Sequence, residues 1–278
     1  ISINQEVGYQ YSPAIIGDNS SGLFIIYGDQ GDGSIDLKVQ KINADYQPEW
    51  QNNGLEVMKG LDGDINYTKT FKVTDNDLYL LWEDNRASKK IFSTRVLNSE
   101  LDTLNGKQLT FGDNSSSETD FSTPFFIQSS NNFYTATFDG SSSPKFLRIN
   151  KIDETLNNLW DSSGVALSAV FDMRSVKLQE IGDDVGCFWS ESRGFNYDIY
   201  YQRLNSDGSI ALVDQGVELV NSNGDDYIIE IIPTQDDRFI IFWLEDAWPA
   251  ASLKFTKIDA DGNVEIGWNP NGHQLSIS

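Results

Sequence analysis

The chain has 278 residues, and its 42 acidic and 20 basic residues give a formal net charge of −22. A surface this acidic repels phosphate backbones and argues against a nucleic-acid partner, and no run approaches the ~18 apolar residues of a membrane span. One Cys and one His argue against a disulfide framework, a Cys or His metal cluster and a Ser-His-Asp triad.

One segment recurs five times along the chain, most clearly as WSESRGFNYDIYYQRLN at residues 189–205. The copies begin 52 to 55 residues apart, and an acid stands two positions after each opening residue. The opening residues and their acids are Tyr27 and Asp29, Trp82 and Asp84, Thr137 and Asp139, Trp189 and Glu191, and Trp243 and Glu245. Such a period is typical of repeat architectures, in which neighbouring units bury one another's faces.

Each repeat predicts four strands in chain order. The first strand is moderately apolar and is predicted at 12–17, 68–73, 123–128, 175–181 and 228–233. The second is the most apolar and ends at the repeated opening residue, as expected of a strand covered on both faces. The third alternates, as at 198–202, and a turn beginning with Asn or Asp leads to a short fourth strand beside a glycine.

These units predict an all-β fold. Four short antiparallel strands in units of about 50 residues are typical of β-propeller blades. We predict a five-bladed β-propeller of four-stranded antiparallel blades, with a fragment of a larger propeller as the alternative. Residues 1–278 would form one domain, with repeats centred on 10–60, 64–114, 119–169, 171–221 and 225–278. Both ends of the chain match the closing strand of a unit, so they either close one ring or mark equivalent cuts in a longer array.

The repeated polar and aromatic residues have a structural interpretation. A carboxylate just past a strand can accept backbone N–H bonds and fix the turn, and a catalytic site would break the repeat. The same holds for the residues that begin each third turn, Asn43, Asn98, Asp153, Asn205 and Asp259. We expect the repeated aromatics to pack between blades and Trp50 and Trp160 to form a second structural set.

Polar residues before the first strands are the candidate ligand site, because they would surround one mouth of a propeller channel. They could hold a cation through oxygen ligands, act as the carboxylates of a glycosidase, or only cap backbone groups. The acids in question are Asp64, Asp120, Asp172 and Asp226.

Two weaker candidates come from loops. Asp29, Asp32 and Asp36 have a spacing that could coordinate Ca²⁺ without completing an EF-hand pattern; otherwise no cofactor is expected. Phe195, Tyr197 and Trp248 follow second strands and could stack on a glycan, although ordinary loop packing is the favoured alternative.

The repeat also resembles a bacterial surface-protein repeat. WSESR at 189–193, DIYYQR at 198–203, NSDG at 205–208 and GVEL at 216–219 follow its pattern W-x-D-x-R, D-I-Y-x-Q-R, D-x-x-G, G-V-x-V, and WEDNR at 82–86 is a second match. This repeat is common in large secreted Bacteroidetes proteins, often type IX secretion substrates. The resemblance implies a propeller on an extracellular or cell-surface protein, usually without assigned activity.

We therefore predict a non-enzymatic extracellular or cell-surface module. It would bind a protein or glycan, or act as a scaffold within a larger secreted chain or assembly, without membrane insertion. One alternative is a five-bladed glycoside hydrolase that uses carboxylates at the channel mouth. Another is a purely structural set of blades in a long adhesin.

Overall fold

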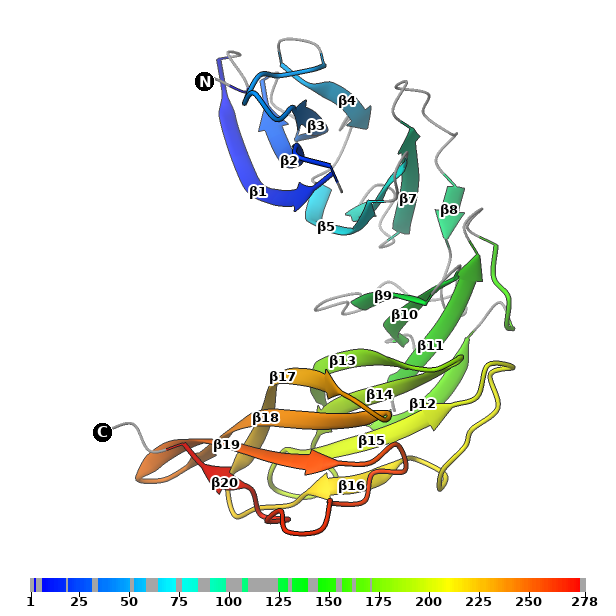
Figure 1. Ribbon diagram of the computed structural model, residues 1–278, viewed down its shortest axis with the longest axis vertical. Coiled ribbons are helices and arrows are strands. Elements are labelled where there is room, and N and C mark those ends of the chain that lie inside the picture. The colour runs from blue at the N-terminus through cyan, green and yellow to red at the C-terminus, as the bar shows by residue number, and fades with distance from the viewer. Residues whose placement is uncertain are drawn as a thin grey trace. The chain divides into compact units, whose positions relative to one another are not determined.

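The computed structural model describes residues 3, 7–18, 20–31, 35–50, 53–58, 65–73, 77–84, 91–98, 107–109, 125–129, 132–139, 145–153, 157–161, 164–170 and 172–275. These residues form five four-stranded antiparallel sheets, each with its strands in chain order (Figure 1). The predicted all-β class is therefore confirmed. Within this described part, no helix is long and apolar enough to cross a membrane.

The chain divides into two compact units, residues 1–110 and 111–278, and each is described by itself. The first unit holds two sheets. One contains β1 (Tyr9–Gly17), β2 (Leu23–Gln30), β3 (Asp36–Ile42) and β4 (Leu55–Met58). The other contains β5 (Ile65–Val73), β6 (Asp77–Asp84), β7 (Ile91–Asn98) and β8 (Lys107–Leu109).

The second unit holds three sheets. The first contains β9 (Phe125–Ser129), β10 (Asn132–Asp139), β11 (Lys145–Asp153) and β12 (Val165–Val170). The next contains β13 (Met173–Ile181), β14 (Asp184–Glu191), β15 (Asp198–Leu204) and β16 (Val217–Val220). The last contains β17 (Asp225–Thr234), β18 (Arg238–Ala247), β19 (Ala250–Ile258) and β20 (His273–Gln274).

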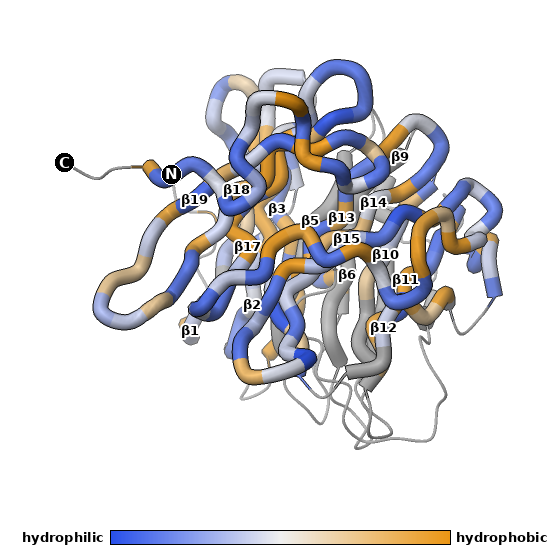
Figure 2. The backbone as a smooth tube through the Cα atoms, turned by 90° about the horizontal axis from the view of Figure 1, so that it is seen from below, coloured by the Kyte–Doolittle hydropathy of each residue, from blue (hydrophilic) through white to orange (hydrophobic). Residues whose placement is uncertain are grey.

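Neighbouring sheets of the second unit bury their apolar faces against each other. Trp189 of β14 packs with Leu147 of β11, and Trp243 of β18 packs with Phe188 of β14. Both tryptophans are fully buried, which confirms that these repeated aromatics pack between sheets. Figure 2 shows hydrophobic and hydrophilic segments alternating along the strands. The first strand of the middle sheet, β13, contacts the first strands of both neighbouring sheets, β9 and β17.

A repeated glycine is required beside these tryptophans. Gly216 has φ +84°, and a Cβ there would lie 2.6 Å from the Trp189 ring. Gly272 has φ +78°, and its Cβ would clash with the Trp243 ring. A side chain is therefore excluded both by the left-handed backbone and by the buried aromatic.

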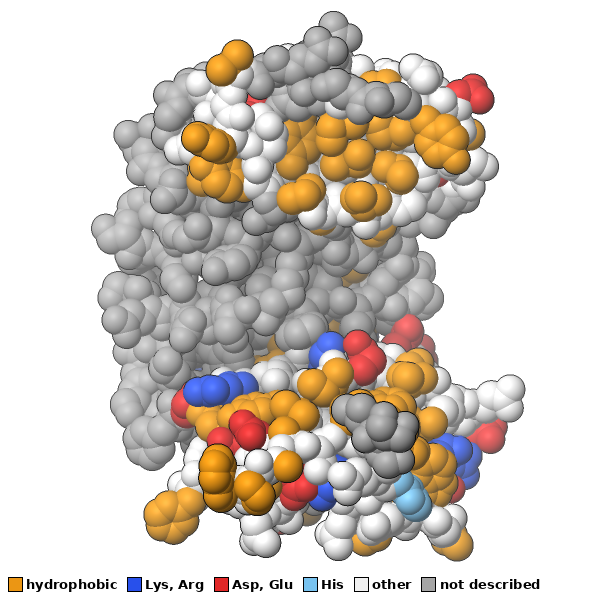
Figure 3. All heavy atoms as spheres, turned by 90° about the vertical axis from the view of Figure 1, so that its left-hand side faces the viewer, with side chains coloured by type: hydrophobic (Ala, Val, Ile, Leu, Met, Phe, Trp, Pro, Cys, Tyr) orange, Lys and Arg blue, Asp and Glu red, His pale blue; other side chains and the backbone are white. Residues whose placement is uncertain are grey.

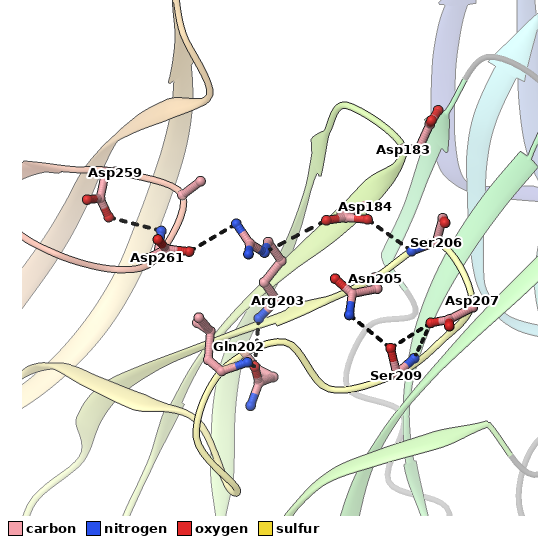
Figure 4. Close-up of polar contacts among 12 residues, drawn as sticks. Asp183, Asp184, Gln202, Arg203, Asn205, Ser206, Asp207, Ser209, Asp259 and Asp261 are labelled. Carbon is pink, nitrogen blue, oxygen red and sulfur yellow. Dashed lines mark hydrogen bonds and ion pairs between the residues drawn. The ribbon is translucent and has the colours of Figure 1, made fainter.

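In the first and last sheets, the turn after the third strand is fixed by its first residue, as predicted. Asp259 Oδ1 accepts the backbone N–H groups of Asp261 and Asn263, both at 2.9 Å. Asn43 makes the equivalent contacts in the first unit. Figure 4 shows how Arg203 adds a link between sheets, 3.0 Å from Asp261 in the turn of the last sheet and 3.8 Å from Asp184 in its own sheet.

Candidate active site

The repeated acid of the middle sheet has a structural role, but not with the predicted partner. Glu191 is fully buried and accepts hydrogen bonds from Trp189 Nε1 and Ser168 Oγ, both at 2.8 Å. Arg193, the Arg of the repeat pattern, forms an ion pair with the same carboxylate. The prediction that this acid binds backbone N–H groups is therefore wrong, because a buried carboxylate is stabilised best by a cation and several donors.

In two sheets that lack this Arg, a lysine from the third strand replaces it. Lys38 Nζ lies 2.7 Å from Asp29, and Lys254 Nζ lies 2.5 Å from Glu245. Each lysine lies directly opposite the repeated aromatic in the strand register, where the middle sheet has Tyr200. The cation is thus present in all three sheets, but its position in the sequence differs.

The Ca²⁺ candidates in the first unit stay a prediction. The carboxylate of Asp29 is held by Lys38, and Asp36 is a buried residue opposite Asp29 in the β2–β3 register. Asp32 lies outside the described residues. Among the residues described, no group of three or more His, Cys, Asp or Glu side chains is placed to hold a metal ion.

The four acids predicted at the channel mouth have different outcomes. Asp64 and Asp120 lie outside the described residues. Asp172 is exposed and accepts a hydrogen bond from the Tyr197 hydroxyl, with Arg174 at 3.7 Å. Asp226, at the equivalent position of the last sheet, is 0% exposed. Equivalent positions therefore hold one solvated and one buried carboxyl group.

Asp226 is an unpartnered buried acid. Neither of its carboxyl oxygens has a hydrogen-bond partner among the described residues. Burial, together with the charges of Glu245 and Asp198, raises the pKa of Asp226 to about 7, although Ser222 and Lys254 oppose the shift. This group is therefore largely protonated below neutral pH and titrates close to it.

Glu245 lies opposite Asp226 in the β17–β18 register but has the reverse behaviour. Burial alone would raise the pKa of Glu245, but hydrogen bonds from Lys254 and Ser222 and the Lys254 charge lower it overall. Two adjacent carboxyl groups whose pKa values are pushed apart can act as a proton donor and an ionised partner.

A third acid, Asp198, lies at the start of β15 and was not predicted. Burial and the charges of Glu218 and Asp225 raise the pKa of Asp198 to about 6, while Arg193 lowers it. Its Oδ1 atom is buried with no hydrogen-bond partner among the described residues. The signal in the sequence is the acid that opens the DIYYQR match, since Phe146 and Ser252 stand at this position in the neighbouring sheets and Asp36 occupies it in the first unit.

A cavity of about 290 Å³ lies beside these acids. Its lining is mostly polar and comprises Val220, Asn221, Ser222, Asn223, Glu245, Lys254 and Asn271. Glu245 and Ser222 line the cavity and also act on Asp226. The cavity therefore shares two of its lining residues with the surroundings of Asp226, which does not itself line it.

Loop aromatics surround this end of the sheets. Phe195 and Trp248 are almost completely exposed, so the expectation of ordinary loop packing is wrong for both. Tyr197 behaves differently, because its ring lies 5.6 Å from that of Tyr227. Phe195 and Trp248 therefore face solvent from the connections after β14 and β18.

No protein-family model matches the sequence, and the search of curated proteins finds no match. Among solved structures, an ulvan lyase of polysaccharide lyase family PL25 matches with a TM-score of 0.59 at 10% identity, over 91% of this chain and 68% of that one. An endo-arabinase from Bacteroides thetaiotaomicron matches with a TM-score of 0.45 at 14% identity, over 88% and 93%. A GH32 β-fructofuranosidase from Bombyx mori matches with a TM-score of 0.40 at 13% identity, over 92% and 64%.

These findings correct the predicted function. The prediction of a non-enzymatic module is overturned, because the solved structure that shares this fold at a TM-score of 0.59 is named as a polysaccharide lyase. The likeness to the lyase shows the fold, and it supports the β-propeller class.

Proposed function

We propose that this chain is a glycoside hydrolase with a β-propeller fold and that Asp226 is its proton donor. The observation that carries the proposal is the pair formed by Asp226 and Glu245. One carboxyl group is buried with its pKa raised to about 7, and its neighbour is kept ionised by Lys254. Glycoside hydrolysis uses such a pair, one acid to protonate the leaving oxygen and one carboxylate to assist attack on the sugar.

Each residue of the site has a proposed role. Asp226 supplies the proton that the glycosidic oxygen receives as the bond from that oxygen to the anomeric carbon breaks, but Asp226 is 0% exposed and passes this proton on through another side chain. Glu245 acts on the anomeric carbon, as nucleophile or through a water molecule that it deprotonates. The proton reaches the cavity by way of the Ser222 hydroxyl, which lies near both carboxyl groups. Asn221, Asn223 and Asn271 line the cavity and can hydrogen-bond to sugar hydroxyls. This chemistry needs no cofactor.

A lyase reaction is less well supported by the site. Elimination requires a base that removes a carbon-bound proton, and a tyrosine is suited to this role only if its pKa is near the working pH. Burial and the hydrogen bond with Asp172 raise the pKa of Tyr197 to about 12, and burial also raises the pKa of Tyr227. The tyrosines beside the site therefore stay protonated near neutral pH.

The wider setting is also part of the proposal. We propose that the five sheets close into one five-bladed ring, because each has the same strand order. Within the second unit, the first strand β13 contacts the first strands β9 and β17. Such contacts are expected where the first strand of each blade lies nearest the propeller axis. We further propose an extracellular location, which fits a polysaccharide substrate and the likeness of the repeat to secreted proteins.

The experiment is a hydrolysis assay on a panel of polysaccharides, with reducing ends measured and unsaturated products monitored by ultraviolet absorbance. We expect reducing ends without unsaturation, and a loss of about 10²- to 10⁴-fold in kcat for Asp226→Asn, as for removal of a general acid. Asp183→Asn is the matched control, because this acid lies in the β13–β14 turn at the opposite end of the strands. Full activity of Asp226→Asn, or unsaturated products, would contradict the proposal.

A further inference from the structure

Beside Asp226 lies a cluster of side chains that the proposed chemistry does not use. It contains two tyrosine rings, one guanidinium and two carboxylates, contributed by the middle and last sheets of the second unit. We call it the tyrosine platform, and its members are Asp172, Arg174, Tyr197, Asp225 and Tyr227.

Short contacts fix the geometry of the platform. The guanidinium of Arg174 lies 4.7 Å from the Tyr197 ring centre and 5.9 Å from that of Tyr227. The Tyr227 hydroxyl donates to Asp225 Oδ2 at 3.1 Å, and the Tyr197 backbone N–H donates to Asp225 Oδ1 at 3.0 Å. The Tyr227 ring is oriented by its hydrogen bond to Asp225 and the Tyr197 ring by the bond from its hydroxyl to Asp172, so little side-chain freedom remains to be lost on binding.

The platform is both accessible and polar at its edges. Arg174 and Asp172 are more than half exposed, and both tyrosines are only half-buried. On the face shown in Figure 3, hydrophobic, acidic and basic side chains are intermixed in the second unit. Aromatic faces bordered by hydrogen-bonding groups are what the apolar face and hydroxyl edge of a sugar ring require.

We infer that the tyrosine platform is a second sugar-binding subsite. It holds an uncharged sugar unit of the polysaccharide whose cleavage is proposed above. The preference for an uncharged sugar follows from charge, because two carboxylates face one guanidinium and a uronate would meet net repulsion. The inference rests on the proposed function in one respect: the polysaccharide bound at the platform is the one that the proposed active site cleaves.

The position of the platform sets the length of the ligand. The Asp226 backbone N–H donates to the Tyr197 carbonyl at 2.7 Å, so platform and proton donor are adjacent. Side chains alternate along a strand, so Asp225 and Tyr227 face away from Asp226. A ligand that occupies both places must cross the end of β17, and it therefore needs several linked sugar units.

The test measures binding separately from cleavage. In the Asp226→Asn background, calorimetry is run with neutral hexasaccharides of arabinose, mannose, xylose, glucose, galactose and fructose, and with hexagalacturonate. We expect at least one neutral hexasaccharide to bind and hexagalacturonate not to bind. Adding Tyr197→Ala should weaken binding about five- to tenfold, whereas Tyr197→Phe keeps the ring and most of the affinity. Tyr46→Ala is the control, since this exposed tyrosine lies in the turn after β3.

Thermal melting checks that each variant folds, and Arg174→Gln offers an exposed change that should weaken binding in the same direction. Unchanged affinity in Tyr197→Ala, no binding of any neutral hexasaccharide, or tighter binding of hexagalacturonate would each overturn the inference. If the unmodified protein cleaves nothing but binds through Tyr197, the proposed function fails and the subsite stands. If cleavage occurs and Tyr197→Ala leaves kcat/KM on the hexasaccharide unchanged, the subsite fails and the proposed function stands.

Discussion

The middle and last sheets of the second unit carry the same repeat but use its polar positions differently. In the middle sheet, Arg193 from the loop after β14 neutralises Glu191, which is fully buried. In the last sheet the cation comes from β19, and the carboxylate of Glu245 lines a cavity. Ala247, the last residue of β18, stands at the position of this Arg, so no Arg side chain is supplied to Glu245 from there.

This difference shows how a structural element can become a reactive one. The fold requires a cation beside each buried acid, because an uncompensated charge is costly to bury. It does not fix which strand or loop supplies that cation. When the third strand supplies it, the acid keeps its charge and gains access to the cavity, and an unpartnered Asp226 lies beside it.

The largest expected effect comes from the fully buried pair. Glu191→Ala leaves Arg193, the Trp189 indole N–H and the Ser168 hydroxyl without their shared acceptor, and should cost about 3–5 kcal/mol of unfolding free energy. Glu245→Ala should cost less, because Lys254 is partly exposed and can be solvated. Denaturant unfolding of both variants measures the difference. Equal losses of unfolding free energy in the two variants would show that Glu191 and Glu245 do not differ in how strongly the fold depends on their ion pairs.

A double substitution tests whether the cation beside Glu245 can come from the position of the repeat Arg instead of from the third strand. Lys254→Tyr puts the residue of the middle sheet into β19 and should cost about 2–3 kcal/mol, since Glu245 loses its cation. Adding Ala247→Arg restores the loop Arg of the repeat and should recover at least half of that loss. A double-mutant cycle by denaturant unfolding gives the coupling. Additive effects would mean that the loop Arg cannot replace the strand lysine.

The smallest expected difference between a variant and the unmodified protein, about 1–3 kcal/mol, concerns the pH dependence of stability. Because the folded-state pKa of Asp226 is about 7 against an ordinary 3.8, the folded protein retains a proton that the unfolded chain releases. Stability therefore falls as pH rises from about 4 to 7, by roughly 4 kcal/mol from this group alone. Asp226→Asn removes that slope but buries an unpartnered amide at a cost of about 1–3 kcal/mol.

Above pH 7 the Asp226→Asn variant should therefore be more stable than the unmodified protein by about 1–3 kcal/mol, and below pH 5 this advantage should be lost. Unfolding free energies measured across that range give the result. A parallel pH dependence in the two proteins would show that Asp226 has an ordinary pKa in the folded chain. A gain in stability with a loss of activity is the combination expected of a catalytic acid.

Much of the fold follows from local patterns in the sequence. The strand order of each sheet, the burial of Trp189 and Trp243, and the turn fixed by Asp259 depend on residues close together in one repeat. Such features can be read from periodicity and turn chemistry because they involve short-range contacts. The sequence also indicated Asp226, although only as one of four candidate acids.

Tertiary structure decided which of these positions carries chemistry. Lys254 neutralises Glu245 because β18 and β19 pair in one register, and Asp226 has a raised pKa because two sheets exclude water from it. Asp198 joins them through its proximity in space, and Phe195 and Trp248 stay exposed because nothing packs over their loops among the described residues. The burial and the pKa of a side chain depend on neighbours that are distant in the sequence. They therefore cannot be predicted from a single repeat unit.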